Sequence, residues 1–293
     1  MSEELKINCP LCQDSRTFFF RKGTLSYENI SWEKFKITDS DYGLFPDLYR
    51  CQNCGLTFAH PLPPADKIIK LYSQMEDPEY EQEHEGRGEN FRRILKVLSR
   101  LRPDKGRLLD VGCATGIFME IARKWGWEVI GVEPSQWAVS VARSKGLKVF
   151  QGDFADVPEE EKYDVITMID FIEHTNKPAI MLRKAHRLLK KGGVLLIVTP
   201  DISSLAAKIT GRKWWHLRPG HLCFFRKETI FYLEKTFSFK ILLLRHYVWT
   251  FSLHYLITRF PFGRKYFNFG IFKKIKLKLP LMDSLEVYFE KLS

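Results

Sequence analysis

The stretch LLDVGCATG, residues 108–116, decides which fold this sequence adopts. It begins with the hydrophobic residues of a buried strand and continues into a glycine-containing turn, an arrangement that brings a nucleotide-like ligand to the start of a helix. A dinucleotide-binding turn reads G-x-G-x-x-G, whereas here Asp110 precedes Gly112, Cys113 and Gly116, and the middle glycine is missing. Because a carboxylate is unfavourable beside a pyrophosphate, we expect a ligand with a cationic group, such as an ammonium or a sulfonium.

Strand and helix patterns alternate regularly after Pro103. Strands are predicted at residues 107–112, 128–133, 147–151, 163–169 and 193–199, and helices near residues 116–125, 135–145 and 177–190. This alternation indicates a parallel sheet with helices on both faces. Ligands of such sheets bind at the carboxyl ends of the strands.

Polar residues follow the next two strands at that same edge. Glu133 ends the second strand in VIGVEPS, and its carboxylate is suited to both hydroxyls of a ribose. The third strand ends in QGDF, where Asp153 is a candidate acceptor for an adenine amino group and Phe154 an aromatic that packs on the ring. The sequence therefore predicts an adenosine-containing ligand.

The succession LLDVGCATG, VIGVEPS, QGDF, YDVITMIDFIEH and LLKKGGVLLIVTP resembles the class I S-adenosylmethionine-dependent methyltransferases over roughly residues 90–245. The resemblance implies an α/β, Rossmann-like fold with a seven-stranded sheet, whose last strand, antiparallel, is formed by residues 283–292. It implies that the glycine turn holds the methionine part, Glu133 the ribose, and Asp153 with Phe154 the adenine. The cofactor-binding set is Asp110, Gly112, Cys113, Gly116, Glu133, Asp153, Phe154 and Asp170.

Four of the six cysteines form two C-x-x-C pairs, Cys9 with Cys12 and Cys51 with Cys54. Paired doublets in a chain without a visible secretory signal favour metal ligation over disulfides, and four thiolates form the tetrahedral shell that zinc prefers. A redox role or plain core cysteines are the alternatives. The segment LYRCQNCGLTFAHPLPPADKIIKLYS also resembles the zinc-ribbon leader of one branch of these methyltransferases, in which the zinc is structural.

These patterns divide the chain into three parts. Residues 1–64 form the zinc-ribbon-like leader, residues 65–102 a helical linker, and residues 103–293 the methyltransferase domain. Within the linker, the acidic run EDPEYEQEHEGRGE, residues 76–89, is expected to be a solvated connection between two helices.

The catalytic candidates lie in two segments. DFIEH, which contains Asp170, Glu173 and His174, resembles a segment of the ubiquinone-pathway O-methyltransferases, in some of which these residues are linked with a divalent cation such as magnesium. The alternatives are a general base at His174 or a helix cap. The loop GRKWWHLRPGHLCFF adds His216 and His221 as residues on the acceptor side. We therefore take His174, Glu173 and His221 as the catalytic set.

A local excess of positive charge marks the C-terminal part. Residues 205–280 contain sixteen Lys or Arg, two Glu and eighteen aromatic residues, and the basic aromatic insertion lies at about residues 251–280. This composition suits peripheral contact with an anionic membrane, and nucleic acid is a less favoured partner. A substrate lid packed on the core is the third interpretation.

The sequence as a whole predicts a methyltransferase that uses S-adenosylmethionine and acts on oxygen of a small-molecule, glycan or lipid-linked acceptor. A zinc-ribbon nucleic-acid-binding protein or an RNA methyltransferase is the alternative, and a non-catalytic scaffold is a third class. No transmembrane segment is apparent, so we expect a cytoplasmic protein, peripheral on the inner membrane face if the insertion binds lipid.

Overall fold

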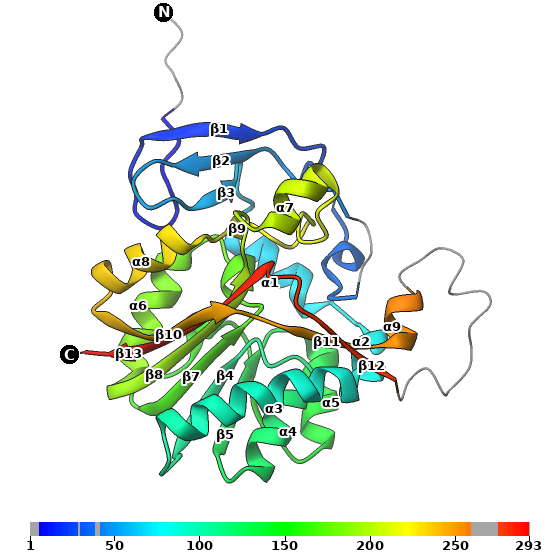
Figure 1. Cartoon of the computed structure of the whole chain (residues 1–293), viewed down its shortest axis with the longest axis vertical. Helices are drawn as coiled ribbons and strands as arrows, with labels where there is room; N and C mark the ends of the chain where they lie inside the picture. Colours follow the sequence, from blue (N-terminus) through cyan, green and yellow to red (C-terminus); the bar gives the residue numbers. More distant parts are fainter. Residues whose placement is uncertain (1–5, 29, 39–41, 259–274, 293) are drawn as a thin grey trace, which may run out of the picture.

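A seven-stranded sheet forms the centre of the molecule in a computed structural model that describes residues 6–28, 30–38, 42–258 and 275–292 (Figure 1). Its strand order is β10-β13-β8-β7-β4-β5-β6, and β13 runs antiparallel between β8 and β10. The strands are β4 (Arg107–Val111), β5 (Glu128–Glu133), β6 (Lys148–Gln151), β7 (Tyr163–Ile169), β8 (Leu189–Pro200), β10 (Phe239–His246) and β13 (Ser284–Lys291). The predicted Rossmann-like sheet, with its antiparallel last strand, is confirmed.

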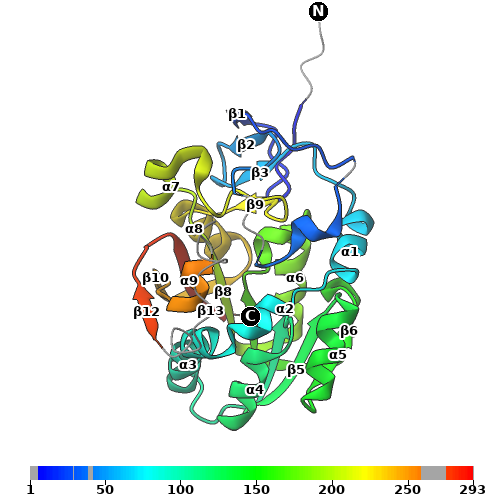
Figure 2. The same ribbon diagram turned by 90° about the vertical axis from the view of Figure 1, so that its right-hand side faces the viewer.

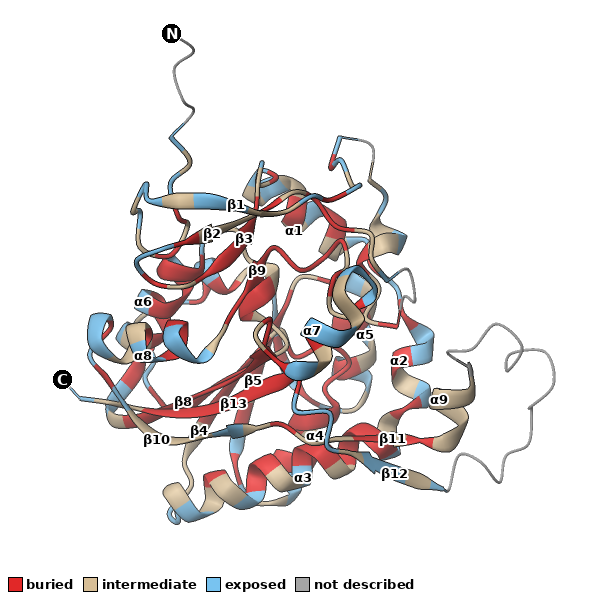
Figure 3. Ribbon diagram, turned by 45° about the horizontal axis from the view of Figure 1, so that its top comes forward, coloured by how far each residue is buried: buried red, intermediate tan, exposed pale blue. Residues whose placement is uncertain are grey.

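Helices cover both faces of this sheet because alternate strand residues point to opposite sides. On one face lie α3 (His84–Leu101), α4 (Ile117–Lys124) and α5 (Gln136–Ser144), which pack with Leu108 and Val165. On the other lie α6 (Pro178–Leu188) and α8 (Lys227–Thr236), which pack with Leu109 and Ile166. Figure 3 shows the buried strands between these two layers.

The predicted elements agree with the observed ones, except at the start of β8. That strand begins at Leu189, four residues before the predicted start at residue 193. The additional residues include Gly192 and Gly193, and the pairing register of β8 with β7 shifts between Tyr163 and Val165.

The leader forms a second sheet that stacks on one end of the central sheet (Figures 1 and 2). It contains β1 (Thr17–Arg21), β2 (Leu48–Cys51) and β3 (Thr57–Ala59), and its fourth strand is β9 (Cys223–Phe224), which comes from the C-terminal half of the chain. Phe58 pairs with Cys223, and both belong to the core that includes α6 and α8. The segment that follows β8 therefore contributes a strand to the sheet of the leader.

The acidic run at residues 76–89 is not a solvated linker, so that expectation is wrong. After α1 (Ala65–Ser73), this run forms α2 (Pro78–Gln82) and the first turns of α3. Tyr80, Glu83 and Arg87 are each less than 9% exposed. Their burial has a structural cause, because the main chain of the distant strand β11 (Trp249–Ser252) packs on α3. The side-chain amide of Asn90 exchanges hydrogen bonds with the backbone of Thr250.

The described ends of the basic insertion form a hairpin on α3. Strand β11 (Trp249–Ser252) pairs antiparallel with β12 (Lys276–Leu279), and α9 (Leu253–Thr258) follows β11. Most basic and aromatic residues proposed for membrane contact, at positions 259–274, lie outside the described residues. A short helix, α7 (Leu205–Thr210), precedes the loop that leads to β9.

Candidate active site

Two neighbouring cavities open at the carboxyl ends of β4, β5 and β7. The larger has a volume of about 470 Å³ and the smaller about 130 Å³. Residues from the leader, the glycine turn and the end of β7 line both of them: Phe35, Ile37, Gly112, Ala114, Asp170 and His174. Both cavities therefore lie at the edge of the sheet where the sequence predicts ligand binding.

The smaller cavity contains the carboxylate predicted to bind ribose. Glu133 Oε2 accepts a hydrogen bond from the Ala114 amide at 3.0 Å, and Oε1 accepts one from the Ser135 amide at 2.9 Å. Burial raises the pKa of Glu133 to about 6, although both amides favour the charged form. These bonds fix the carboxylate at the end of β5, and each oxygen keeps a further lone pair for a hydroxyl.

Asp153 and Phe154 line the same cavity. Asp153 Oδ1 accepts a hydrogen bond from the Ala155 amide at 3.1 Å, which caps a short 3₁₀ helix, and the Phe154 ring meets Phe171 edge-on at 6.2 Å. Phe154 is only 2% exposed. The structure thus brings an acidic and an aromatic side chain together with Glu133 in the wall of the smaller cavity.

Asp110, Gly112 and Cys113 line the larger cavity, whereas Gly116 lies outside the walls of both cavities. Gly116 has a φ of 80°, and a Cβ atom there would approach Leu147 to 2.3 Å, so its part is to form the tight turn into α4. Asp110 accepts a hydrogen bond of 2.6 Å from the Thr167 hydroxyl. Burial raises the pKa of Asp110 to about 7.

Sequence reasoning missed the cavity wall contributed by α2 and α3. The guanidinium of Arg87 lies 4.0 Å from the centroid of the Tyr80 ring, and its buried Nε has no hydrogen-bond partner among the described residues. None of the ion pairs in the described part of the chain includes Arg87. The available signal was that Arg87 is the only Lys or Arg in an otherwise acidic run. A buried cation in a cavity is suited to an anionic ligand group.

Aromatic side chains at the start of the insertion and just before it line the larger cavity. Trp249 stacks on Phe251 with ring centroids 5.6 Å apart, and Phe251 stacks on Tyr255 at 5.1 Å. Tyr247 meets Trp249 edge-on. For the part of the insertion that the structure describes, these contacts favour the interpretation as a lid packed on the core over the interpretation as a membrane-binding segment.

The DFIEH segment lies where β7 ends, and its two acidic residues differ in environment. Asp170 has a φ of 50° and faces both cavities. Burial raises the pKa of Asp170 to about 6, against the opposing effects of His216 and Arg87. Glu173 is fully buried, and its Oε2 accepts a hydrogen bond from Thr199. Burial raises the pKa of Glu173 well above its usual range, and the neighbouring charge of Asp170 raises it further.

His174 and His221 complete a compact cluster with Glu173. The three side chains have potential ligand atoms within 4.8 Å of one another, and the imidazole centroids are 4.6 Å apart. Nδ1 of His174 is 2.5 Å from the Tyr72 hydroxyl and 2.8 Å from the Gly220 carbonyl. Burial lowers the pKa of His174 to about 3 and that of His221 well below its usual value, so both rings are neutral at neutral pH.

This cluster does not fit magnesium. Magnesium prefers oxygen ligands in octahedral geometry, whereas the cluster offers two imidazoles and only one carboxyl group, which is fully buried. Asp170, the other carboxylate that the resemblance implied, is not part of the group. We therefore assign no chemical step to a divalent cation here.

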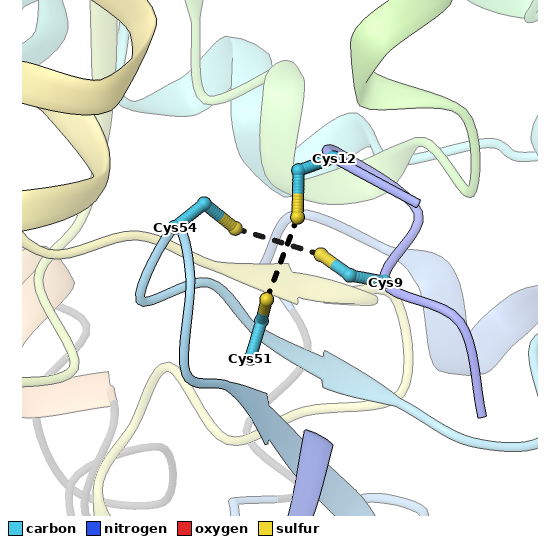
Figure 4. Close-up of side chains that lie close together, drawn as sticks. All are labelled: Cys9, Cys12, Cys51 and Cys54. Carbon is cyan, nitrogen blue, oxygen red and sulfur yellow. Dashed lines mark hydrogen bonds between the residues drawn. The ribbon is translucent and has the colours of Figure 1, made fainter. Parts of the chain in front are cut away.

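The four cysteines of the two C-x-x-C pairs converge in the leader, as Figure 4 shows. The sulfur atoms of Cys9 and Cys54 are 3.5 Å apart, and those of Cys12 and Cys51 are 3.4 Å apart. A disulfide is about 2.05 Å long, whereas Zn–S bonds of about 2.3 Å in a tetrahedron place the sulfurs about 3.8 Å apart. The cluster therefore fits a tetrahedral zinc ion and not a pair of disulfides.

Comparisons with known proteins agree with this geometry. A family model described as a methyltransferase domain matches residues 83–243. The chain is 30% identical over 134 residues to a ubiquinone biosynthesis O-methyltransferase of Azorhizobium caulinodans, covering 41% of this chain and 53% of that protein. The enzyme of the same name from Pelagibacter ubique is 30% identical over 118 residues, covering 38% and 49%. The chain thus spans about half the length of these curated relatives.

Solved structures show the same fold at low sequence identity. The magnesium protoporphyrin IX methyltransferase of Synechocystis PCC 6803 has a TM-score of 0.51 and 15% identity, covering 74% of this chain and 89% of that one. A S-adenosylmethionine-dependent methyltransferase from Archaeoglobus fulgidus has a TM-score of 0.51 and 18% identity, covering 73% and 100%. Because the family model also matches more than half of the chain, this protein belongs to the methyltransferase domain family.

Proposed function

We propose that this protein transfers the methyl group of S-adenosylmethionine to an oxygen atom of a small-molecule acceptor. The observation that carries the proposal is that Asp110, Glu133 and Asp153 lie at the carboxyl ends of three adjacent parallel strands. Asp110 lines the larger cavity, and Glu133 and Asp153 line the smaller one beside it. Bound S-adenosylmethionine supplies an electrophilic methyl group on a sulfonium. The chain supplies the binding groups and the geometry.

The residues of the cofactor site are proposed to bind or position separate portions of S-adenosylmethionine. Glu133 accepts hydrogen bonds from both ribose hydroxyls in the smaller cavity, and Asp153 with Phe154 holds the adenine. Asp110, Gly112 and Cys113 face the methionine ammonium in the larger cavity, and Gly116 shapes the turn that places them. The buried guanidinium of Arg87 is suited to the methionine carboxylate, because no carboxylate of the described chain pairs with it. Asp170 faces both cavities, between the cofactor and the acceptor.

The acceptor is proposed to occupy the outer part of the larger cavity. Trp249, Phe251 and Tyr255 line this cavity together with polar side chains that include His216 and His221. His174 lines both cavities, so its neutral ring is close to the position where methyl group and acceptor meet. We propose that His174, supported by Glu173 and His221, contacts the acceptor hydroxyl.

Cofactor affinity is predicted to fall as the solution becomes acidic. Burial raises the pKa of Asp110 to about 7, and only the ionised carboxylate attracts an ammonium group. Binding therefore requires loss of this proton, and affinity for S-adenosylhomocysteine should drop about tenfold between pH 8 and pH 6. Calorimetry across this range measures the effect. The Asp110→Asn variant should bind more weakly at pH 8 with a flatter profile, and an equally steep profile in that variant would remove Asp110 as the cause.

A glycan or lipid-linked acceptor and peripheral membrane contact remain proposals based on composition. The described chain has no helix with the length and hydropathy of a membrane span. Lys276 and Lys278 lie in β12, while Lys273 and Lys274 lie outside the described residues. Each basic residue near an anionic surface contributes about 1 kcal/mol, so replacing all four with Glu should abolish cosedimentation with phosphatidylglycerol vesicles at low salt. If the unsubstituted protein stays in the supernatant at low salt, the membrane proposal fails.

The experiment for the proposed function follows the methyl label. Purified protein is incubated with S-adenosylmethionine carrying a labelled methyl group and a total cell lysate, which is then separated into small-molecule, lipid, RNA and protein fractions. The proposal predicts label in the small-molecule or lipid fraction. Label confined to RNA would favour the alternative function, an RNA methyltransferase.

A further inference from the structure

His216, in the wall of the larger cavity, is paired with the buried carboxylate of Asp283. His216 Nε2 lies 3.1 Å from Asp283 Oδ2, and the indole nitrogen of Trp215 donates a 2.7 Å hydrogen bond to the same oxygen. Asp283 directly precedes β13 and is completely buried, whereas His216 belongs to the loop between α7 and β9. Two segments separated by 67 positions thus meet at this pair.

The pair determines which nitrogen of His216 carries the proton. Burial raises the pKa of Asp283, but the hydrogen bonds and charge of its neighbours outweigh this effect, so the pKa of Asp283 is below its ordinary value. An ionised carboxylate only accepts hydrogen bonds, so Nε2 of a neutral His216 must be the protonated nitrogen. Nδ1 then keeps its lone pair, and the described part of the chain provides it with no hydrogen-bond donor.

His216 also has the right position for a reaction at the cofactor. Its side chain remains 13% exposed and lines the same cavity as Asp110, Gly112 and Cys113. Asp170 is close enough for the charge of His216 to act on its pKa. A positive charge formed on His216 during a reaction would therefore be near two carboxyl groups, Asp283 at Nε2 and Asp170, which lines the same cavity.

The two other histidines of this cavity are less suited to receive a proton. Nδ1 of His174 already contacts the Gly220 carbonyl and the Tyr72 hydroxyl, and burial lowers the pKa of His174 to about 3. Burial also lowers the pKa of His221 well below its usual value. Among the three, only His216 pairs with a carboxylate within the described residues.

We propose that His216 is the general base of this site and that Asp283 is its positioning residue; the inference rests on the proposed methyl transfer to oxygen. The acceptor hydroxyl gives its proton to Nδ1 of His216 while its oxygen forms a bond to the methyl carbon. The bond from sulfur to this carbon breaks, and its electron pair stays on sulfur. The products are the methyl ether, neutral S-adenosylhomocysteine and an imidazolium held by Asp283, which later releases the proton to solvent.

The first test reads the tautomer of His216 and needs no acceptor. NMR of protein with ¹⁵N-labelled histidine, loaded with S-adenosylhomocysteine, should show His216 protonated at Nε2 in the neutral ring, with the signal assigned by its loss in His216→Gln. In Asp283→Asn the side-chain amide is able to donate to Nε2, so the proportion protonated at Nδ1 should increase. A wild-type ring protonated at Nδ1 would overturn the proposal.

The second test measures methyl transfer from labelled S-adenosylmethionine to a protein-free small-molecule extract of cells. His216→Gln should lower the turnover rate about 10²–10⁴-fold while the KM for S-adenosylmethionine stays within about threefold. Asp283→Asn should lower turnover in the same way, with cofactor binding retained. The control is His84→Gln, because His84 is partly exposed on α3 and pairs with Glu120; its rate should equal that of the wild type.

The outcomes separate this inference from the proposed function. If wild-type protein transfers no label to the extract, the proposed methyl transfer fails, while NMR still decides whether the His216 and Asp283 pair has the inferred tautomer. If wild-type protein is active, His216→Gln retains its rate and His174→Ala loses about 10²-fold, the base is His174 and the inference about His216 is wrong.

Discussion

The Glu133→Ala variant is expected to bind S-adenosylhomocysteine about 10²–10⁴-fold more weakly than the wild type. A carboxylate that accepts hydrogen bonds from two ribose hydroxyls loses two charge-assisted bonds, roughly 1.5–3 kcal/mol each. The amides of Ala114 and Ser135, which donate to the same carboxylate, also lose their partner, so the glycine turn loosens. Calorimetry with S-adenosylhomocysteine measures the loss.

Two further variants separate ligand contact from a general disturbance. Glu133→Gln keeps the shape of the side chain and one acceptor oxygen, so its affinity should lie between those of the wild type and of Glu133→Ala. Asp156→Ala removes an exposed carboxylate of the neighbouring 3₁₀ helix that faces neither cavity, and it should leave the affinity unchanged. If Glu133→Ala binds within threefold of the wild type, Glu133 does not hold the ribose.

The Cys51→Ser variant is expected to lose zinc and the fold of the leader together. A structural zinc bound by four cysteines contributes about 10–16 kcal/mol to folding, so its loss should strongly destabilise the leader. The loss should extend to methyl transfer, because β3 pairs with β9 and the loop before β9 holds His216 and His221. Elemental analysis and hydrogen exchange of residues 48–59 measure the two effects.

Cofactor binding should survive this substitution better than methyl transfer does. Glu133 lies on the central sheet, and Asp153 and Phe154 lie at the 3₁₀ helix that follows β6. Among the described residues of the leader, Phe35 and Ile37 line the smaller cavity, and both are apolar. Cys113→Ser, outside the cluster, should retain one zinc per chain. Wild-type protein that contains no zinc when purified without chelators would contradict the assignment of the four cysteines.

The sequence was informative where function depends on neighbours along the chain. The central strands, the glycine turn and the acidic residues at their ends are local patterns, since a buried strand and the turn after it are read within about ten residues. The two C-x-x-C pairs are also local patterns, since each spans only four residues. For this reason the sheet and the meeting of the four cysteines agree with prediction.

Contacts between distant segments could not be predicted in this way. Asp283 meets His216 only because β13 inserts between β8 and β10, and Arg87 becomes a cavity residue only because β11 packs against α3. In the sequence, Arg87 belongs to a run whose charge is typical of a solvated segment. The residues next to Asp283 and Arg87 in the sequence do not indicate the segments that these two side chains contact. Their places in the site therefore follow only from the fold.

The central claim is that the cavities at the strand ends form a site for S-adenosylmethionine, and competitive calorimetry tests it most directly. Wild-type protein titrated with S-adenosylhomocysteine should bind one molecule per chain, should bind NAD far more weakly or not at all, and should lose the first interaction in Glu133→Ala. Tighter binding of NAD than of S-adenosylhomocysteine, or no binding of S-adenosylhomocysteine by folded, zinc-containing protein, would contradict the account.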